Sequence, residues 1–169
     1  KFKFVQNLCR DLVRISWGFF IKVAKNCGRL DYKFELSELN GGSNLVIANH
    51  PSLLDVVFLV SKFKRINCIV KGELGKNIFL FAAIRACNYI PNTNNEEFLQ
   101  KSVEVLKSGE NLLIFPEGTR TKDEIVFHKA AAYIGVKGAK NIVCIGINMH
   151  PRSLRKNEPW YKIPDEKIK

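Results

Sequence analysis

The chain has 169 residues, of which 46% are apolar and 25% are charged, proportions that indicate a globular protein and exclude a disordered or fibrous one. This length favours one domain with a sizeable core. Its 27 Lys and Arg residues against 16 Asp and Glu give a formal net charge of +11, which favours an anionic partner such as a membrane surface, a nucleic acid or a phosphorylated small molecule. The five cysteines are scattered without a C-x-x-C pair, which indicates a reducing compartment, and no segment resembles a signal peptide.

A basic amphipathic helix is predicted in residues 1–30, where seven basic residues stand against a single acid. Apolar residues recur there at helical spacing, at Val5, Leu8, Cys9, Leu12, Ile15 and Phe19. The run is too short and too charged to span a bilayer, but it suits a bilayer interface. We expect membrane contact through Trp17, Phe19, Phe20 and Lys22. The alternative is a helix that simply packs on the domain.

Short apolar strands alternate with helices in the rest of the chain. Strands are predicted at 32–36, 45–48, 65–70, 89–90, 112–115 and 142–147, and helices at 51–63, 77–86, 96–107 and 127–137. The tail after Pro151 is predicted to be irregular. This order indicates an α/β domain, residues 31–169, with a mostly parallel sheet flanked by helices. Because the chain begins with Lys, we expect it to be truncated at one or both ends.

His50 and Asp55 are candidates for general-base chemistry at the start of the 51–63 helix. Asp55 lies one turn into that helix, and helical side chains lean toward the N-terminus, so its carboxylate can reach the imidazole. A carboxylate on one ring nitrogen leaves the other free to take a proton, typically worth about 10²–10⁴ in rate. No recognisable nucleophile elbow is present, so a base here implies direct deprotonation of an acceptor hydroxyl. The alternative is that His50 caps the helix and Asp55 favours its positive end.

Metal binding is not expected, because His50, His128 and His150 are isolated and form no ligand motif.

A second candidate segment, residues 115–120, follows the strand at 112–115. Gly118 lets backbone approach a ligand closely, Arg120 offers a planar fork for phosphate, and Glu117 can accept a hydrogen bond from a substrate hydroxyl. Sites in parallel sheets form at the carboxyl ends of strands, so this segment and His50 are expected to share one crevice. The alternative is a solvated turn.

Together the two segments resemble those of the glycerolipid acyltransferase family, which includes the 1-acyl-sn-glycerol-3-phosphate acyltransferases. The matching segments are Asn49-His50-x-Ser52-x-x-Asp55 and Phe115-Pro116-Glu117-Gly118-Thr119-Arg120, with further likeness in Lys71-x-Glu73-Leu74, in Phe127-x-Lys129-x-Ala131-Ala132 and in Ile145-x-Ile147 with Pro151. The resemblance covers about residues 30–151.

The resemblance implies a membrane-peripheral acyltransferase of phospholipid biosynthesis, on the cytoplasmic face. His50 would deprotonate a lysolipid hydroxyl with Asp55 as its orienting partner, and the alkoxide would attack the thioester of acyl-CoA or acyl carrier protein, with no further cofactor. The acceptor would be 1-acylglycerol-3-phosphate and the product phosphatidic acid. Acceptor binding is implied for Glu117, Gly118, Thr119 and Arg120, and phosphate or donor contacts are possible for Lys71, Lys129 and Asn92.

One departure concerns residues 87–93, where the family usually has a basic residue for the acceptor phosphate and this chain has no arginine. Asn92 supplies no charge there, so Arg120, Lys71 or Lys129 would substitute, or the acceptor would be another lysolipid or a specialised lipid. Two other classes of protein are alternatives. A non-catalytic lipid-binding module is marked by a lost His or Asp, and a nucleic-acid binder by basic and aromatic residues interleaved across the domain.

Overall fold

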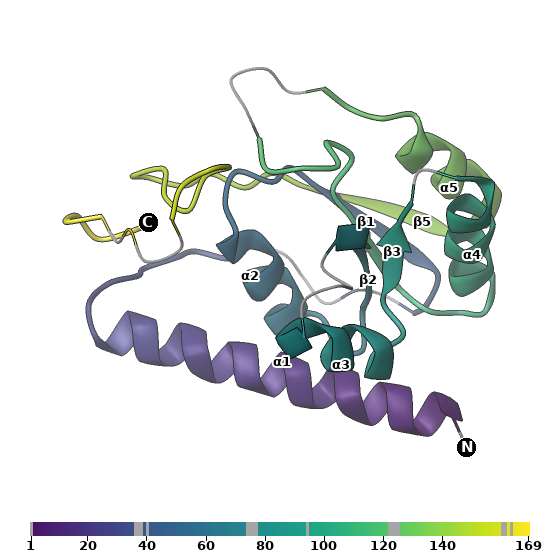
Figure 1. The fold of residues 1–169 in the computed structure, drawn as a ribbon, viewed down its shortest axis with the longest axis horizontal. Coiled ribbons are helices and arrows are strands. Elements are labelled where there is room, and N and C mark those ends of the chain that lie inside the picture. Colours follow the sequence, from purple (N-terminus) through teal and green to yellow (C-terminus); the bar gives the residue numbers. More distant parts are fainter. Residues whose placement is uncertain are drawn as a thin grey trace.

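The computed structural model describes residues 2–35, 39, 41–73, 78–93, 95–121, 126–159, 162 and 164–169. Five helices and five strands alternate in these residues (Figure 1). The helices are α1 (Phe2–Asn26), α2 (Leu54–Lys62), α3 (Ile78–Ala86), α4 (Glu96–Lys107) and α5 (Ala130–Gly138). The strands are β1 (Asn44–Ala48), β2 (Asn67–Lys71), β3 (Ile90–Asn92), β4 (Leu112–Ile114) and β5 (Asn141–Ile145). The expected α/β class is confirmed.

The strands form one sheet in the order β3-β2-β4-β1-β5, and every neighbouring pair is parallel. The prediction of a strand that ends before Pro91 was wrong, since Pro91 lies inside β3 opposite Val70. Proline lacks the N–H that a central strand needs, and β3 tolerates it because it lies at the edge of the sheet.

The two faces of the sheet are covered by different helices because successive side chains of a strand point to opposite faces. Leu45 of β1 belongs to a buried cluster with residues of α4 and α5. Its neighbour Val46 belongs to a second cluster with residues of α2, against which Trp17 of α1 packs. Figure 1 shows α4 and α5 together on one side of the sheet and α1 and α2 on the other. Apolar β1 residues are therefore buried on both faces.

The connections leave the sheet in a way that creates a switch point between β1 and β4. The chain leaves β1 through α2 on one face and returns to β2, whereas it leaves β4 through α5 on the other face and returns to β5. Adjacent strands whose connections go to opposite faces open a crevice at their carboxyl ends. His50 follows β1 and Glu117 follows β4, so the fold places both residues at this crevice.

Helix α1 is attached to the domain along one side. Arg10 is 2% exposed, its Nε donates to the carbonyl of Cys87 at 2.8 Å, and its Nη1 pairs with Glu110 at 2.7 Å. Ile21 is buried in a third apolar cluster near the start of the domain, where Trp17 also packs. The helix is thus docked by both a buried ion pair and apolar contacts.

The opposite side of α1 is exposed and apolar. Its exposed large side chains include Leu8, Leu12, Ile15, Phe19 and Val23, which recur every three or four residues and so form one stripe, here called the outer stripe. Among the helices that the structure describes, none is both long and apolar enough to cross a membrane.

The strand predicted at 32–36 was wrong over residues 32–35, which are irregular, and Leu36 lies outside the described residues. Tyr32 and Phe34 alternate because they pack edge-on against Phe58 and Phe63 at α2, with ring centroids 5.0 and 6.1 Å apart. The tail after Pro151 is irregular as predicted where it is described, apart from a single bridge between Ile168 and Leu30.

Candidate active site

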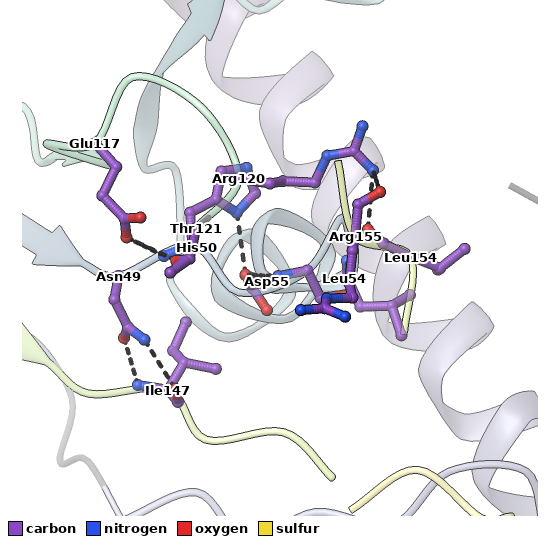
Figure 2. Close-up of polar contacts among 11 residues, drawn as sticks. Asn49, His50, Leu54, Asp55, Glu117, Arg120, Thr121, Ile147, Leu154 and Arg155 are labelled. Atoms are coloured by element: carbon purple, nitrogen blue, oxygen red, sulfur yellow. Dashed lines mark hydrogen bonds and ion pairs between the residues drawn. The ribbon is translucent and has the colours of Figure 1, made fainter. Parts of the chain in front are cut away.

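The turn between β1 and α2 brings His50 and Asp55 into contact. The Nδ1 atom of His50 lies 3.0 Å from Oδ2 of Asp55, and the two side chains are 14% and 1% exposed (Figure 2). An ionised carboxylate only accepts hydrogen bonds, so this contact places the ring proton on Nδ1. The lone pair of Nε2 is then available to take a proton from another molecule.

The same Asp55 oxygen also binds the start of the helix. Oδ2 accepts a hydrogen bond from the backbone N–H of Ser52 at 2.7 Å, two residues before α2 begins. Burial raises the pKa of the Asp55 carboxyl above its ordinary value, although the hydrogen bonds from His50 and Ser52 act in the opposite direction. Within the described part of the chain its other oxygen, Oδ1, has no hydrogen-bond partner. Asp55 therefore binds both the His50 ring and the backbone just before α2.

The loop after β4 holds the main chain of His50. Glu117 is 6% exposed, and its Oε1 accepts a hydrogen bond from the His50 N–H at 2.9 Å. The same oxygen accepts from the hydroxyl of Thr121 at 2.9 Å, and the N–H of Thr121 donates to the His50 carbonyl at 2.6 Å. The His50 ring stacks on Phe115, with centroids 4.2 Å apart. The motif containing Phe115 and Glu117 was found in the sequence, whereas Thr121 was not singled out.

Asn49 ties the same turn to the strand on its other side. Its side-chain amide donates to the carbonyl of Ile147 at 2.9 Å, and its Oδ1 accepts from the N–H of Ile147 at 2.6 Å (Figure 2). The Asn49 side chain thus pairs with the Ile147 main chain as a neighbouring strand would, just beyond the end of β5. His50 is consequently fixed from both neighbouring strands.

Gly118 occupies a position that few other residues fit. Its φ of +64° lies in the left-handed region, and an added Cβ would lie 3.3 Å from the ring of His128. His128 is in turn anchored by its own N–H, which donates to the carbonyl of Pro116 at 2.8 Å. The glycine therefore lets the segment before α5 fold back over the loop after β4.

Arg120 is directed to the segment after β5. Its Nη1 donates to the carbonyls of Leu154 and Arg155 at 2.8 and 2.9 Å, as Figure 2 shows. One of its donor nitrogens is thus engaged with protein. Thr119 lies half-buried in the same loop. The predicted acceptor-binding residues are therefore adjacent, but two of them, Glu117 and Arg120, also hold neighbouring backbone.

Lys71 and Asn92 lie further along the same edge of the sheet. They are register partners at the ends of β2 and β3, and Lys71 pairs with Glu73 at 2.5 Å. Neighbouring strands are about 4.8 Å apart, and β2 is two strands from β1, so Lys71 lies roughly 10 Å from the dyad. Lys129 is exposed directly before α5. Leu74 of the Lys71-x-Glu73-Leu74 segment lies outside the described residues.

The residues predicted to contact a membrane do not share one side of α1. Phe19 and Phe20 are 69% and 45% exposed, and Lys22 is also exposed. Trp17, in contrast, is half-buried and packs on the domain. The side of α1 that carries Trp17 thus packs on the domain, and membrane contact through the exposed side stays a prediction.

A cavity of about 330 Å³ lies behind Asp55. Its mostly apolar wall includes Leu30, Phe34, Phe58, Ile147 and Met149. Asp55 and Phe58 of α2 line it together with residues 144–147 at the end of β5.

The fold and the site define a parallel α/β domain that carries a histidine–carboxylate pair at the switch point of its sheet. More specifically, the chain belongs to the acyltransferase family, whose family model matches residues 29–151. It is 32% identical over 94 residues to 1-acyl-sn-glycerol-3-phosphate acyltransferase of Helicobacter pylori strain J99, an alignment that covers 52% of this chain and 40% of that protein. The crystal structure of the 1-acyl-sn-glycerophosphate (LPA) acyltransferase PlsC from Thermotoga maritima matches with a TM-score of 0.63 at 25% identity, over 81% of this chain and 67% of that one.

Proposed function

We propose that this protein is an O-acyltransferase that moves a fatty acyl group from acyl-CoA or acyl carrier protein to the free hydroxyl of a lysolipid. The observation that carries the proposal is the 3.0 Å contact between His50 and buried Asp55 at the switch point of the sheet, in a chain of the acyltransferase family. The mostly apolar cavity behind the dyad supports a lipid substrate.

The site supplies a base and leaves the attack to the substrate. In the proposed reaction Nε2 of His50 takes the proton of the acceptor hydroxyl, while Asp55 keeps the other ring nitrogen protonated and stabilises the imidazolium. The acceptor oxygen forms a bond to the thioester carbonyl carbon. The carbon–sulfur bond then breaks, and the leaving thiolate takes the proton from His50. The ester and the free thiol are the products, and the proton balance closes without a cofactor.

We propose 1-acylglycerol-3-phosphate as the acceptor and phosphatidic acid as the product. The names of the two relatives support this choice, as does the basic charge of the chain. Another lysolipid is the second candidate, because Asn92 at the end of β3 supplies no charge for a phosphate and its register partner Lys71 already pairs with Glu73. In either case we expect the lipid headgroup to contact Arg120, Lys71 or Lys129, since residue 92 is an uncharged asparagine.

We further propose that the protein works as a peripheral protein at the cytoplasmic face of a membrane. The outer stripe of α1 supports this, because an exposed apolar face on a basic helix suits the bilayer interface. The buried Arg10 pair keeps that helix attached to the domain. A lysolipid in the bilayer would then be reached without leaving it.

The test is a panel of lysolipids with acyl-CoA and acyl carrier protein donors, read by mass spectrometry, for the wild type and His50→Ala. We expect the wild type to acylate 1-acylglycerol-3-phosphate and His50→Ala to lose at least about 10²-fold in rate while it still folds and binds vesicles. A wild type that binds lysolipid but acylates none would support a non-catalytic lipid-binding module. Near-normal transfer by His50→Ala would refute the general-base role.

A further inference from the structure

The main chain of His50 is clasped by a closed ring of hydrogen bonds that includes a residue outside the recognised motifs. The Thr121 N–H donates to the His50 carbonyl at 2.6 Å, and the His50 N–H donates to Oε1 of Glu117 at 2.9 Å. The hydroxyl of Thr121 closes the ring by donating to the same Oε1, also at 2.9 Å. Both polar groups of the His50 backbone are thereby held by one loop, and Figure 2 shows the contact from Glu117.

The hydroxyl of Thr121 matters because the carboxylate that it binds is buried. Glu117 is 6% exposed, and a buried charge is tolerated only where hydrogen-bond donors replace water. Its Oε1 has two such donors, the His50 N–H and the Thr121 hydroxyl. Without the hydroxyl, that oxygen would keep the His50 N–H alone, and the carboxylate would gain freedom to rotate away from it.

We propose that Thr121 is a positioning residue for acyl transfer: by fixing the Glu117 carboxylate, its hydroxyl holds the His50 backbone and aims the imidazole at the acceptor hydroxyl. This inference rests on the proposed function. The contacts of Thr121 that carry this role go to the Glu117 carboxylate and to the His50 main chain, so it acts through these groups. The Asp55 contact restrains the same ring from the side of α2, so the ring is aimed by two independent supports.

The expected signature is a loss of turnover without a loss of binding. A catalytic group misplaced by about 1 Å can cost about 10²-fold, and the Asp55 contact that remains makes a loss of roughly 10- to 100-fold the expectation for Thr121→Val. The KM values for acceptor and donor should stay within about twofold, since turnover alone depends on the aim of the base. Thr121→Ser keeps the hydroxyl donor and should stay within about threefold of the wild type.

The experiment measures kcat and KM of the full chain with 1-acylglycerol-3-phosphate and acyl-CoA, for both Thr121 variants. Thr93→Val is the matched control, because Thr93 also donates its hydroxyl to a side-chain oxygen, that of Asn95 at 2.6 Å, on an exposed loop at the far edge of the sheet. Turnover of Thr121→Val within about threefold of the wild type would overturn the proposal, as would a serine variant impaired as much as the valine variant. If Thr121→Val fails to fold, Thr121→Ala replaces it.

A second readout separates this proposal from the proposed function. The ¹⁵N signals of the His50 ring, assigned by their loss in His50→Gln, report its tautomer and environment without any turnover. We expect Thr121→Val to shift or broaden them and Thr121→Ser and Thr93→Val to leave them in place. A wild type without transferase activity would refute the function alone. Ring signals that are identical in the wild type and Thr121→Val would refute the positioning role.

Discussion

Replacing two residues of the outer stripe should release the protein from membranes while leaving its fold intact. The change is Ile15→Gln with Phe19→Gln, at side chains that are 58% and 69% exposed. Glutamine is a good helix former, and neither side chain belongs to a buried cluster, so α1 should persist. The unfolding midpoint should stay close to that of the wild type.

The size of the effect follows from the exposed area. Full burial of an Ile or Phe side chain is worth roughly 1.5–3 kcal/mol, and the exposed fractions leave roughly 1–2 kcal/mol for each to gain in a bilayer interface. The two together contribute at least about 2 kcal/mol. Since about 1.4 kcal/mol is a factor of ten, the partition coefficient should fall by at least about 30-fold.

The assay is cosedimentation with vesicles of phosphatidylcholine and phosphatidylglycerol, over a range of lipid concentrations. High salt screens the attraction between basic residues and anionic lipid, so the apolar part of the binding is read there. The matched control is Tyr133→Gln with Val136→Gln on α5, whose side chains are 47% and 83% exposed. Helix α5 lies on the other side of the sheet from α1 (Figure 1). Equal binding by the two double variants would refute the argument that the outer stripe enters the interface.

Three further predictions concern charge. Asp55→Asn should abolish transfer without lowering the unfolding midpoint at pH 7, because burial raises the pKa of Asp55 and makes its ionised form costly in the folded protein. Any increase in the midpoint over that of the wild type should shrink in acid, where Asp55 becomes protonated. A midpoint below that of the wild type at pH 7 would contradict this. Glu110→Gln should cost about 3 kcal/mol in chemical denaturation, since it leaves the buried Arg10 without its carboxylate. Although burial opposes it, Arg10 with a nearby lysine lowers the pKa of Glu110, so this stabilisation is present at neutral pH and lost as the pH falls through that lowered value; an unchanged midpoint at pH 7 would refute it. Arg120→Ala should raise KM for a phosphorylated acceptor but not for an uncharged one; equal changes for both would leave Arg120 only its contacts with the backbone near Leu154.

Periodic apolar patterns predicted most elements, and local chemistry set some of their ends. The helix predicted at 96–107 has the bounds of α4, because Asn95 accepts a hydrogen bond from the Phe98 N–H at 3.0 Å and closes its start. The alternation at Tyr32 and Phe34 was misread as a strand. A period of two shows that alternate side chains are buried, but it does not show whether they meet a neighbouring strand or a helix such as α2.

The orientation of α1 could not be predicted for a related reason. Both of its sides carry apolar residues, with Trp17 and Ile21 toward the domain and Leu12 and Ile15 away from it. A hydrophobic period locates a helix but does not rank two apolar sides. The side that faces the domain carries Arg10, whose buried ion pair with Glu110 joins two positions that are 100 residues apart in the chain.

The candidate site could likewise be predicted from the sequence only in part. The shared crevice of His50 and Glu117 was predicted because both residues follow strand ends of a mostly parallel sheet, whereas the switch point between β1 and β4 depends on the strand order, which only the structure gives. The clasp by Thr121 depends on which backbone groups of two loops face each other, and a one-dimensional pattern carries no signal for that.

The contacts in the His50 turn are compatible with both the helix-cap and the general-base interpretation. Asp55 Oδ2 accepts from both the Ser52 N–H and His50 Nδ1, so one oxygen atom joins the backbone just before α2 to the imidazole. A carboxylate held by the helix start loses little conformational freedom when it binds the imidazole, so the pairing needs less stabilisation than two free side chains would. The five-residue spacing, which would separate these side chains on a continuous helix, works because His50 lies before the helix and Asp55 within its first turn.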